Sequence, residues 1–427
     1  MICLDCVTPE PLKMLVAQHG RPDNCQYCNK VGPAVETKFL FEYIYERVEE
    51  NIAAEDDLSD FEHVMLYECG AHDVAVQTID IVLMEWFNLG DEPYFDDLYD
   101  GVPSEFKVNH RGQETHFYSD DGLLERNFYE DRWAKFIEDI RHVHRFFNLT
   151  ACDFLDSVFS FLSVDRHELK PDFLRVIGRG EELFRARNAG GYKKAKEIIE
   201  SPATQFGPTP KDRASSQRMT PNGISALYCA LERETCLSEI RSITGDNVVS
   251  VALTPTTQLQ LLDLTKLKRV EPPKLTLLDK GYLDALHLKT FINSLVNKMS
   301  KPKGRNDELS YLSTQVVFEY LRLRFGSQVD GLVFPSVQTG DIGTNVVLFP
   351  EASVLSGKQH TKPNKMEEAY GDKPAEEFEF EAKLAVIAGS IRFHKVTAIE
   401  TKAKEYAHIS ELFMSDLERK RRGPSFT

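Results

Sequence analysis

The sequence predicts an α+β protein, in which a zinc-binding, mainly helical N-terminal part precedes a mixed α/β domain. Two cysteine pairs open the chain, amphipathic helical patterns follow, and short apolar runs between turn formers dominate from about residue 168. A chain of 427 residues exceeds the usual size of one domain. We expect a cysteine module at 1–32, a helical domain at 33–167, a mixed α/β domain at 168–355, and a linker with a C-terminal extension packing on that domain at 356–427.

The charge and apolar pattern exclude some partners. The chain carries 67 acidic and 51 basic residues, a formal charge of −16, which argues against general nucleic-acid binding. The longest apolar stretch, residues 79–87, contains Asp80 and Glu85 and falls short of the roughly 20 residues that a spanning helix needs. The first residues lack the basic leader and apolar core of an export signal. We therefore expect a cytoplasmic protein without a membrane partner; homo-oligomer formation stays open.

The first element, at 1–32, is a candidate metal site. Cys3, Cys6, Cys25 and Cys28 form the pattern C-x2-C-x18-C-x2-C, which matches the spacing of tetrahedral zinc sites. Four sulfur ligands leave no position for water, so the predicted role is structural rather than catalytic. His19 is a less favoured substitute ligand, and a reducing cytoplasm disfavours disulfides.

The second segment predicts helices. Residues 36–54 repeat apolar side chains at helical intervals, and further helices are expected at 73–88, 126–147 and 151–162. Arg111 and His116 superficially match the Arg-x4-6-His pair of helical ribonucleases called HEPN domains. Gly112 makes this stretch a poor helix, so we disfavour the ribonuclease alternative.

The third segment alternates predicted strands with helices, which is typical of an α+β domain. Two helices are expected, at 234–243 and 310–326. The expected strands are 181–191, 223–231, 247–255, 259–265, 330–336 and 343–349. Beyond it, residues 356–377 predict a linker, 378–406 added strands and 408–423 a helix.

Five motifs in this third segment, in order, resemble the RES domain family. They are LFRAR at 183–187, RMTPNG with LYCA at 218–230, ETCLSEIR at 234–241, YLSTQ at 311–315, and DGLVFPS with TNVVLF at 330–349. The resemblance covers roughly 175 residues and implies a fold like that of ADP-ribosyltransferases. It also implies degradation of NAD by a bacterial toxin. The N-terminal part more weakly resembles the HEPN/RES N-terminal domain.

The resemblance implies a set of site residues. Glu239, Tyr228 and Arg218 take catalytic positions, and NAD-binding positions fall on Arg185, Arg218, Tyr228, Ser336 and Asn345. Many family members have Gly-Arg-Trp-Asn where this chain has Gln217 to Thr220, so the pocket wall beside Arg218 is expected to differ. Arg187 competes with Arg185, because alternation along a strand sends both side chains to one face.

The residue types agree with this chemistry. A guanidinium grips phosphate oxygens in pairs, so Arg185 and Arg218 suit the diphosphate of NAD. A fixed carboxylate such as Glu239 stabilises the positive charge that develops on the ribose as nicotinamide leaves. Tyr228 offers a flat face to nicotinamide and, we expect, a free hydroxyl. Ser336 is expected to hold a ribose hydroxyl or the carboxamide.

We therefore predict an NAD glycohydrolase or phosphorylase that needs no metal for the reaction and acts as a toxin or phage-defence effector. An ADP-ribosyltransferase acting on a macromolecule and a non-catalytic NAD sensor are the alternatives. No G-x-G-x-x-G follows a predicted strand, and no phosphate-binding P-loop pattern is present. An antitoxin or another regulatory protein is the expected partner, and domain order makes the N-terminal part a candidate regulator.

Overall fold

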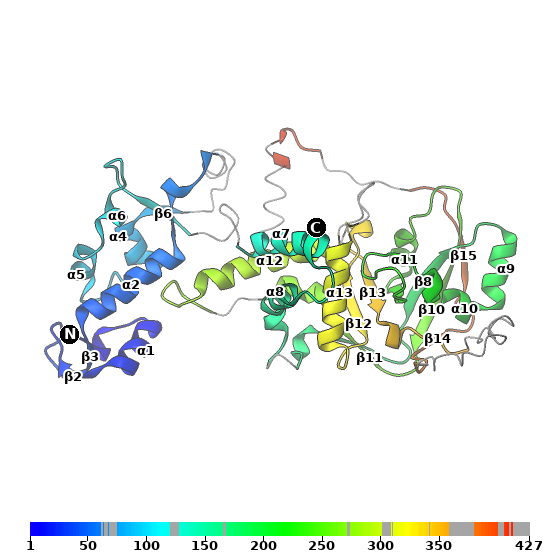
Figure 1. Ribbon diagram of the computed structural model, residues 1–427, viewed down its shortest axis with the longest axis horizontal. Helices are drawn as coiled ribbons and strands as arrows, with labels where there is room; N and C mark the ends of the chain where they lie inside the picture. The colour runs from blue at the N-terminus through cyan, green and yellow to red at the C-terminus, as the bar shows by residue number, and fades with distance from the viewer. Residues whose placement is uncertain are drawn as a thin grey trace. The chain divides into compact units, whose positions relative to one another are not determined.

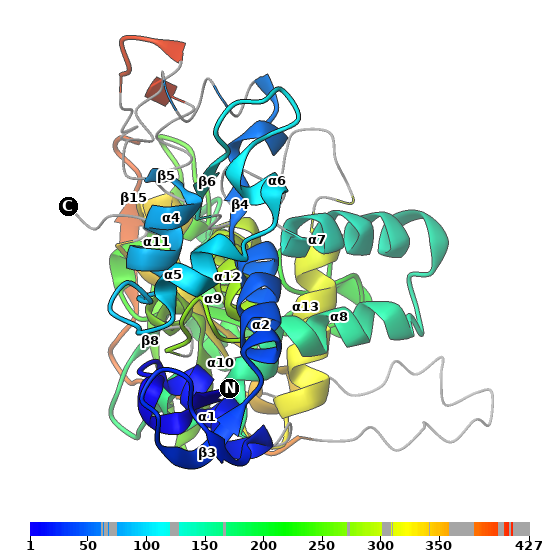
Figure 2. The same ribbon diagram turned by 90° about the vertical axis from the view of Figure 1, so that its left-hand side faces the viewer.

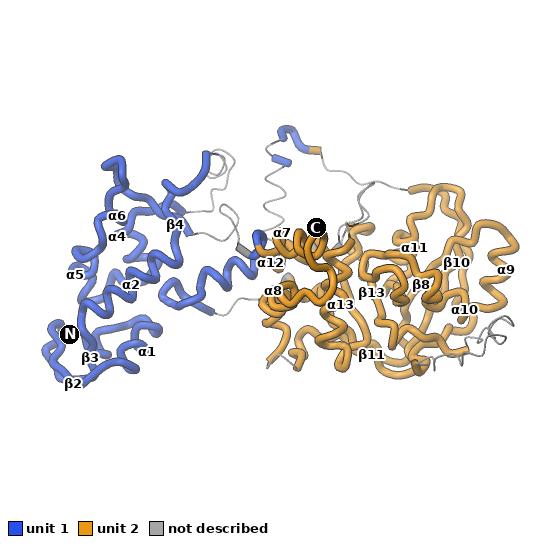
Figure 3. The backbone as a smooth tube through the Cα atoms, viewed as in Figure 1, with its two compact units in different colours: residues 1–131, 270–291, 406–422 blue, residues 132–269, 292–405, 423–427 orange. Residues whose placement is uncertain are grey.

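The computed structural model contains two compact units (Figure 3). It describes residues 1–412 except 61–62, 64–66, 68–74, 120–127, 165–167, 271–273, 301–308, 310, 341, 358–379, 400–404 and 410. The first unit comprises residues 1–131, 270–291 and 406–422, and the second comprises 132–269, 292–405 and 423–427. The predicted C-terminal helix at 408–423 and the linker at 356–377 lie mostly outside the described residues.

The chain begins with a small sheet rather than with turns alone. Its strands β1 (Ile2–Cys3), β2 (Arg21–Asn24) and β3 (Val31–Val35) are antiparallel, in the order β1-β3-β2. Helix α1 (Glu10–His19) has Pro11 in its first turn and buries Leu12 and Val16. It lies against β3 (Figure 2). This sheet brings the two ends of the cysteine pattern together.

The segment predicted as purely helical also contains strands. Helix α2 (Thr37–Asn51) buries Leu40, Ile44 and Val48 along one face, as its periodicity predicts. A second sheet, of order β4-β6-β5, is formed by β4 (Ala53–Ala54), β5 (Val76–Thr78) and β6 (His116–Tyr118). These strands have two or three residues each, too short to show an alternating pattern in the sequence.

One helix prediction for this segment is wrong in detail, and one disfavoured alternative finds no support. The helix expected at 73–88 starts only at α4 (Ile79–Ile81), because Val76–Thr78 pair with β6 instead. The alternative based on Arg111 and His116 has no helix to carry it, since Arg111 lies in a turn and His116 on β6.

Residues 270–291 cluster with the first unit, although we expected the catalytic domain to run unbroken from 168 to 355. The Tyr43 hydroxyl donates to the Leu278 carbonyl at 2.9 Å, and Asn51 Nδ2 donates to the carbonyls of Leu277 and Asp279 at 2.8 and 3.2 Å. Leu278 is buried in the same core as α2. Conversely, residues 132–167 cluster with the second unit. Apolar burial, rather than chain order, decides this division.

The second unit is built on a nine-stranded mixed sheet (Figure 1). The order is β14-β10-β8-β9-β13-β12-β11-β7, and β15 also pairs with β10. The pair β11–β12 is parallel and the other paired strands are antiparallel. The strands are β7 (Leu174–Ile177), β8 (Leu183–Asn188), β9 (Leu227–Ala230), β10 (Asn247–Pro255), β11 (Leu259–Asp263), β12 (Gly331–Pro335), β13 (Thr344–Leu348), β14 (Leu384–Val386) and β15 (Arg392–Lys395).

Helices accompany this sheet. Helix α13 (Leu312–Phe325) buries Val317, Phe318 and Leu321 and lies beside α8 (Leu149–Phe159) (Figure 2). The short helix α11 (Arg233–Glu239) follows β9 directly. Two more described helices of this unit are α9 (Tyr192–Glu200) and α10 (Pro202–Phe206). The first unit contains α5 (Phe95–Asp100) and α6 (Ser104–Lys107), and the residue ranges of the two units meet within α7 (Phe128–Glu138) and α12 (Tyr282–Ser300). In the described part of the chain, no helix has both the length and the apolar character needed to cross a membrane.

The C-terminal strands pair with β10, and β15 is also held by a partly buried chain of polar side chains. Strands β14 and β15 both pair with β10, which lies between them and β8. Arg233 donates to the Ser250 hydroxyl at 2.6 Å, and Ser250 in turn bonds His394 of β15 at 2.8 Å. Burial, followed by the nearby Arg233 charge, lowers the pKa of His394. A neutral His394 can accept a hydrogen bond from the Ser250 hydroxyl, which itself accepts from the Arg233 guanidinium.

Gly331 allows a close approach at the centre of the sheet. A Cβ there would lie 2.2 Å from the Val347 carbonyl oxygen and 2.8 Å from Leu348 Cα. We predict that Gly331→Ala lowers the free energy of unfolding by about 2–4 kcal/mol, because backbone rather than a side chain must move. Denaturant midpoints of purified protein measure this. Gly191→Ala is the control, since its Cβ meets no atom within 4 Å. Equal midpoints for the two variants would contradict the packing.

Candidate active site

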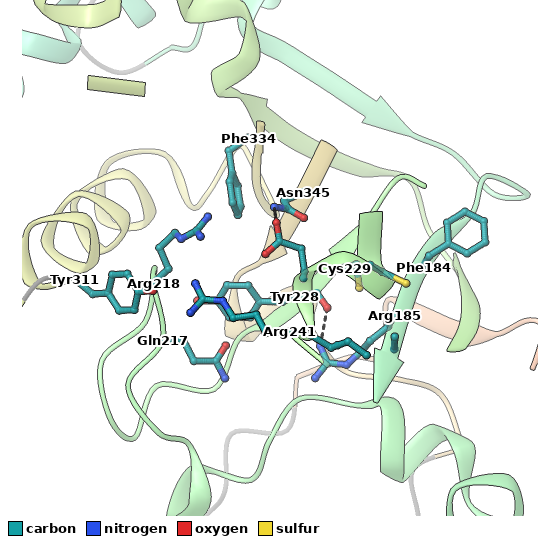
Figure 4. Close-up of a pocket in the computed structure, with 14 residues that line it drawn as sticks. Phe184, Arg185, Gln217, Arg218, Tyr228, Cys229, Arg241, Tyr311, Phe334 and Asn345 are labelled. Atoms are coloured by element: carbon teal, nitrogen blue, oxygen red, sulfur yellow. Dashed lines mark hydrogen bonds between the residues drawn. The ribbon is translucent and has the colours of Figure 1, made fainter. Parts of the chain in front are cut away.

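A cavity of about 320 Å³ opens beside strands β8, β9, β12 and β13 of the second unit (Figure 4). This volume lies at the lower end of the range for small-molecule sites. The lining side chains come from these strands, from α11 and the turn after it, from the loop before β9 and from the start of α13. They are Phe184, Arg185, Ala186, Gln217, Arg218, Tyr228, Cys229, Cys236, Glu239, Ile240, Arg241, Tyr311, Phe334 and Asn345.

Glu239, at the C-terminal end of α11, is oriented by two buried groups. Its Oε1 accepts from Ser336 Oγ at 2.6 Å and from Asn345 Nδ2 at 2.6 Å. Ser336 follows β12 and Asn345 lies on β13, so neighbouring strands hold one carboxylate oxygen. No described residue donates a hydrogen bond to Oε2. The carboxylate is therefore fixed in orientation and keeps one oxygen available to a ligand.

Ser336 acts differently from our expectation. Its side chain is completely buried and does not line the cavity, and its hydroxyl proton goes to Glu239. It positions the carboxylate instead of contacting a ribose or a carboxamide. Asn345 combines both features, because it lines the cavity and also donates to Glu239.

Arg218 lies in a loop that is fixed by hydrogen bonds from side chains of α13. Gln315 Nε2 donates to the Ser216 hydroxyl at 2.8 Å and to the carbonyls of Gln217 and Thr220 at 2.7 and 3.2 Å. The Thr314 hydroxyl donates to the Arg218 carbonyl at 2.7 Å. Both residues belong to the YLSTQ motif, to which we assigned no site residue. Their function is to fix the backbone from which Arg218 enters the cavity.

The Tyr228 hydroxyl is not free, contrary to our prediction. It accepts from the Met219 N–H at 3.1 Å and bonds the Thr220 hydroxyl at 3.2 Å. Burial raises the pKa of the Tyr228 phenol, although the bonds with Thr220 and Met219 act in the opposite direction. The phenol thus holds the Arg218 loop, and the ring lines the cavity.

Arg185 lines the cavity, but its guanidinium is hydrogen-bonded to the backbone of the neighbouring strand. Its Nη1 donates to the Tyr228 carbonyl at 2.8 Å, and its Nε is buried without a partner among the described residues. Burial lowers the pKa of this guanidinium. Arg187, the competing candidate, does not line the cavity; it donates to the Gly207 carbonyl at 3.2 Å. Burial, aided by the charge of Arg185, lowers the pKa of Arg187 to about 10.

Other lining residues escaped the sequence prediction. Tyr311, Phe334 and Arg241 lie within the motifs and Gln217 directly precedes one, but the resemblance assigned a role to none of them. Cys229 and Cys236 also reach the cavity, and burial raises their pKa values to about 11 and about 12. Both thiols are therefore protonated at neutral pH.

The four N-terminal cysteines form a separate cluster in the first unit. Their Sγ atoms all lie within 4.8 Å of one another. Cys3 Sγ lies 3.5 Å from Cys28 Sγ, and Cys25 Sγ lies 3.8 Å from Cys6 Sγ. A zinc–sulfur bond of about 2.3 Å places tetrahedral sulfurs about 3.8 Å apart. None of the four forms a disulfide, and the Cys3 N–H points to Cys25 Sγ at 3.4 Å. The donor set therefore fits a metal ion such as zinc.

Comparison with known proteins supports one assignment. No curated protein and no solved structure matches this chain. One family model does match, over residues 182–367, and it covers the cavity strands, α11 and α13. All six residues that the resemblance implied lie inside this range. The model is that of the RES domain, so residues 182–367 of the chain match the RES domain family.

Proposed function

We propose that this protein cleaves NAD at the bond between nicotinamide and ribose. RES domains are associated with enzymes that act on NAD. The observation that carries the proposal is the orientation of Glu239 by Ser336 and Asn345 in a cavity that also receives Arg218. A fixed carboxylate beside a phosphate-binding guanidinium suits a dinucleotide whose sugar becomes positively charged.

The proposed step is a substitution at the anomeric carbon. As the bond to nicotinamide breaks, its electron pair leaves with the base, and positive charge spreads over the ribose carbon and ring oxygen. The free Oε2 of Glu239 stabilises this charge and orients the attacking molecule. If water attacks, the products are nicotinamide, ADP-ribose and a proton. If phosphate attacks, they are nicotinamide and ADP-ribose 1″-phosphate.

The cavity walls suit the parts of the substrate. The rings of Tyr228, Tyr311 and Phe334 offer flat apolar faces for a base, and Arg218 offers paired donors to a phosphate. Arg185 has mainly a structural role in this assignment, because its guanidinium donates a hydrogen bond to the Tyr228 carbonyl. In this assignment Glu239 contacts the reacting atoms, while Ser336, Asn345, Gln315 and the Tyr228 hydroxyl position the groups that do.

The cellular role follows from the chemistry. Unrestrained loss of NAD stops growth, so we propose a toxin or defence effector that a partner protein or its own N-terminal unit restrains. Deleting residues 1–131 alone is a poor test, because residues 270–291 share their core. Co-purification of the full chain with its partner is the appropriate assay.

We predict that Glu239→Gln lowers nicotinamide release by about 10²- to 10⁴-fold, the usual contribution of such a group. The amide keeps the shape of the side chain but removes its charge. Nicotinamide release from NAD by purified full-length protein, with and without phosphate, measures the loss and identifies the acceptor. Glu234→Gln is the matched control, because Glu234 lies on the same helix but is exposed and outside the cavity.

Other outcomes separate the remaining functions. Label from the ADP-ribose part of NAD that ends on a macromolecule indicates a transferase. Binding of NAD without release of nicotinamide indicates a sensor. Full activity of the Glu239→Gln variant would contradict the proposed role of this carboxylate.

Tyr228→Phe tests whether the phenol holds the loop or takes part in the reaction. The Met219 N–H loses its acceptor, so we expect the free energy of unfolding to fall by about 1–3 kcal/mol. The KM for NAD should rise several-fold as the Arg218 loop loosens, while the turnover rate stays within about threefold of the parent. Steady-state kinetics and denaturation measure both. A turnover rate that falls by about two orders of magnitude or more at unchanged KM would instead give the hydroxyl a chemical role.

We further propose that Cys3, Cys6, Cys25 and Cys28 bind one structural zinc ion. Four thiolates close the coordination sphere, so the metal would link β1, the turn after it and the 25–28 turn without taking part in NAD cleavage. Elemental analysis should find about one zinc per chain. Cys28→Ser should lose the metal and unfold at lower temperature, whereas Cys152→Ser, which changes a free cysteine outside the cluster, should not. Metal-free parent protein of unchanged thermal stability would contradict the site.

A further inference from the structure

Arg241 has an unusual backbone for its residue type. Helix α11 ends at Glu239, Ile240 caps it, and Arg241 follows with φ of +48°. This left-handed position after a helix is commonly filled by glycine, because a side chain is unfavourable there. The other non-glycine residues with positive φ in the described part of the chain are Asn29, Asn88 and Phe147. Asparagine tolerates this conformation, so Arg241 and Phe147 are the exceptions.

The side chain of Arg241 enters the cavity that holds Glu239. Figure 4 shows the side chains of Arg218 and Arg241 reaching into the same space from different parts of the chain. No described residue offers a carboxylate or a hydrogen bond to either guanidinium. Two other arginines of this unit do have carboxylate partners: Arg322 pairs with Glu351 and Arg324 pairs with Asp156.

The charges of the cavity point to an anionic ligand. Its charged side chains are Arg185, Arg218, Arg241 and Glu239, an excess of positive charge within a protein of net charge −16. Arg185 is bonded to the Tyr228 carbonyl, which leaves Arg218 and Arg241 to a ligand. Two free guanidinium groups match an anion that carries two neighbouring charges.

We infer that Arg241 is a substrate-binding residue that, with Arg218, holds the diphosphate of the dinucleotide. This inference rests on the proposed function and gives a role to the last residue of the ETCLSEIR motif, to which the resemblance assigned none. Strained backbone at a functional site is retained where the side chain is needed. Because Arg241 lies two residues after Glu239, the same helix end places the carboxylate and one phosphate-binding group at a fixed separation along the substrate.

Calorimetric titration of the full chain with ADP-ribose tests the inference, because this ligand contains the diphosphate but no bond to cleave. Arg241→Gln should weaken ADP-ribose binding by about 10- to 100-fold, the range for hydrogen bonds to charged groups. Arg241→Lys should lose part of the affinity, since it keeps the charge without the paired donors. Adenosine, which has no phosphate, should bind parent and variant equally. Arg213→Gln is the control, because Arg213 is exposed and outside the cavity.

Arg241→Gly separates a binding role from a structural one. Glycine accepts positive φ, so this variant should melt at the same or a higher temperature while binding ADP-ribose as weakly as Arg241→Gln. A lower melting temperature with parental affinity would make Arg241 a structural residue and overturn the inference. A loss confined to ligands with a 2′-phosphate would move Arg241 from the diphosphate to that group and also overturn it.

The two proposals fail differently. If the parent binds ADP-ribose through Arg241 but releases no nicotinamide from NAD, the proposed reaction falls and the binding site stands. If the parent cleaves NAD and Arg241→Gln binds ADP-ribose normally, the inference falls alone. A parent protein that does not bind ADP-ribose overturns the inference.

Discussion

The two hydrogen bonds to Glu239 Oε1 join three elements that are far apart in the chain. Ser336, which follows β12, and Asn345, on the adjacent strand β13, lie about a hundred residues after the carboxylate, and both donate at 2.6 Å. This bond pair fixes the end of α11 against the sheet. The positions of Ile240 and Arg241, and thus one wall of the cavity, depend on where that helix ends.

A second network fixes the opposite wall without contacting a ligand. Thr314 and Gln315 of α13, with the Tyr228 hydroxyl, hold the 216–220 loop through its backbone. Chain segments about a hundred residues apart thereby share one rigid turn. A buried hydrogen bond of this kind contributes about 1 kcal/mol to the free energy of unfolding. These bonds also fix the backbone position from which the Arg218 side chain extends. Some residues of the family motifs therefore position the loop that carries Arg218 and do not line the cavity themselves.

The first unit depends on a different constraint. Its core is completed by residues 270–291, which lie in the sequence between two segments of the second unit. Neither unit is therefore a continuous stretch of chain. The core of the first unit is therefore complete only with this later segment in place. With the proposed zinc ion bound, the cysteine cluster would offset the small size of the N-terminal sheet, because a metal site supplies stability that strands of two to five residues do not.

Sequence patterns alone predict the mixed α/β class, most strands of the large sheet, the RES motifs and the cysteine spacing, because these features depend on local periodicity and short-range residue order. They do not predict the insertion of 270–291 into the first unit, the sheets of two- and three-residue strands, the bonded state of the Tyr228 hydroxyl, or the part that Arg241 takes in the cavity wall. Those features depend on hydrogen bonds and burial between residues distant along the chain. Only the tertiary structure brings such partners together, since a side chain's neighbours are set by packing rather than by its place in the sequence.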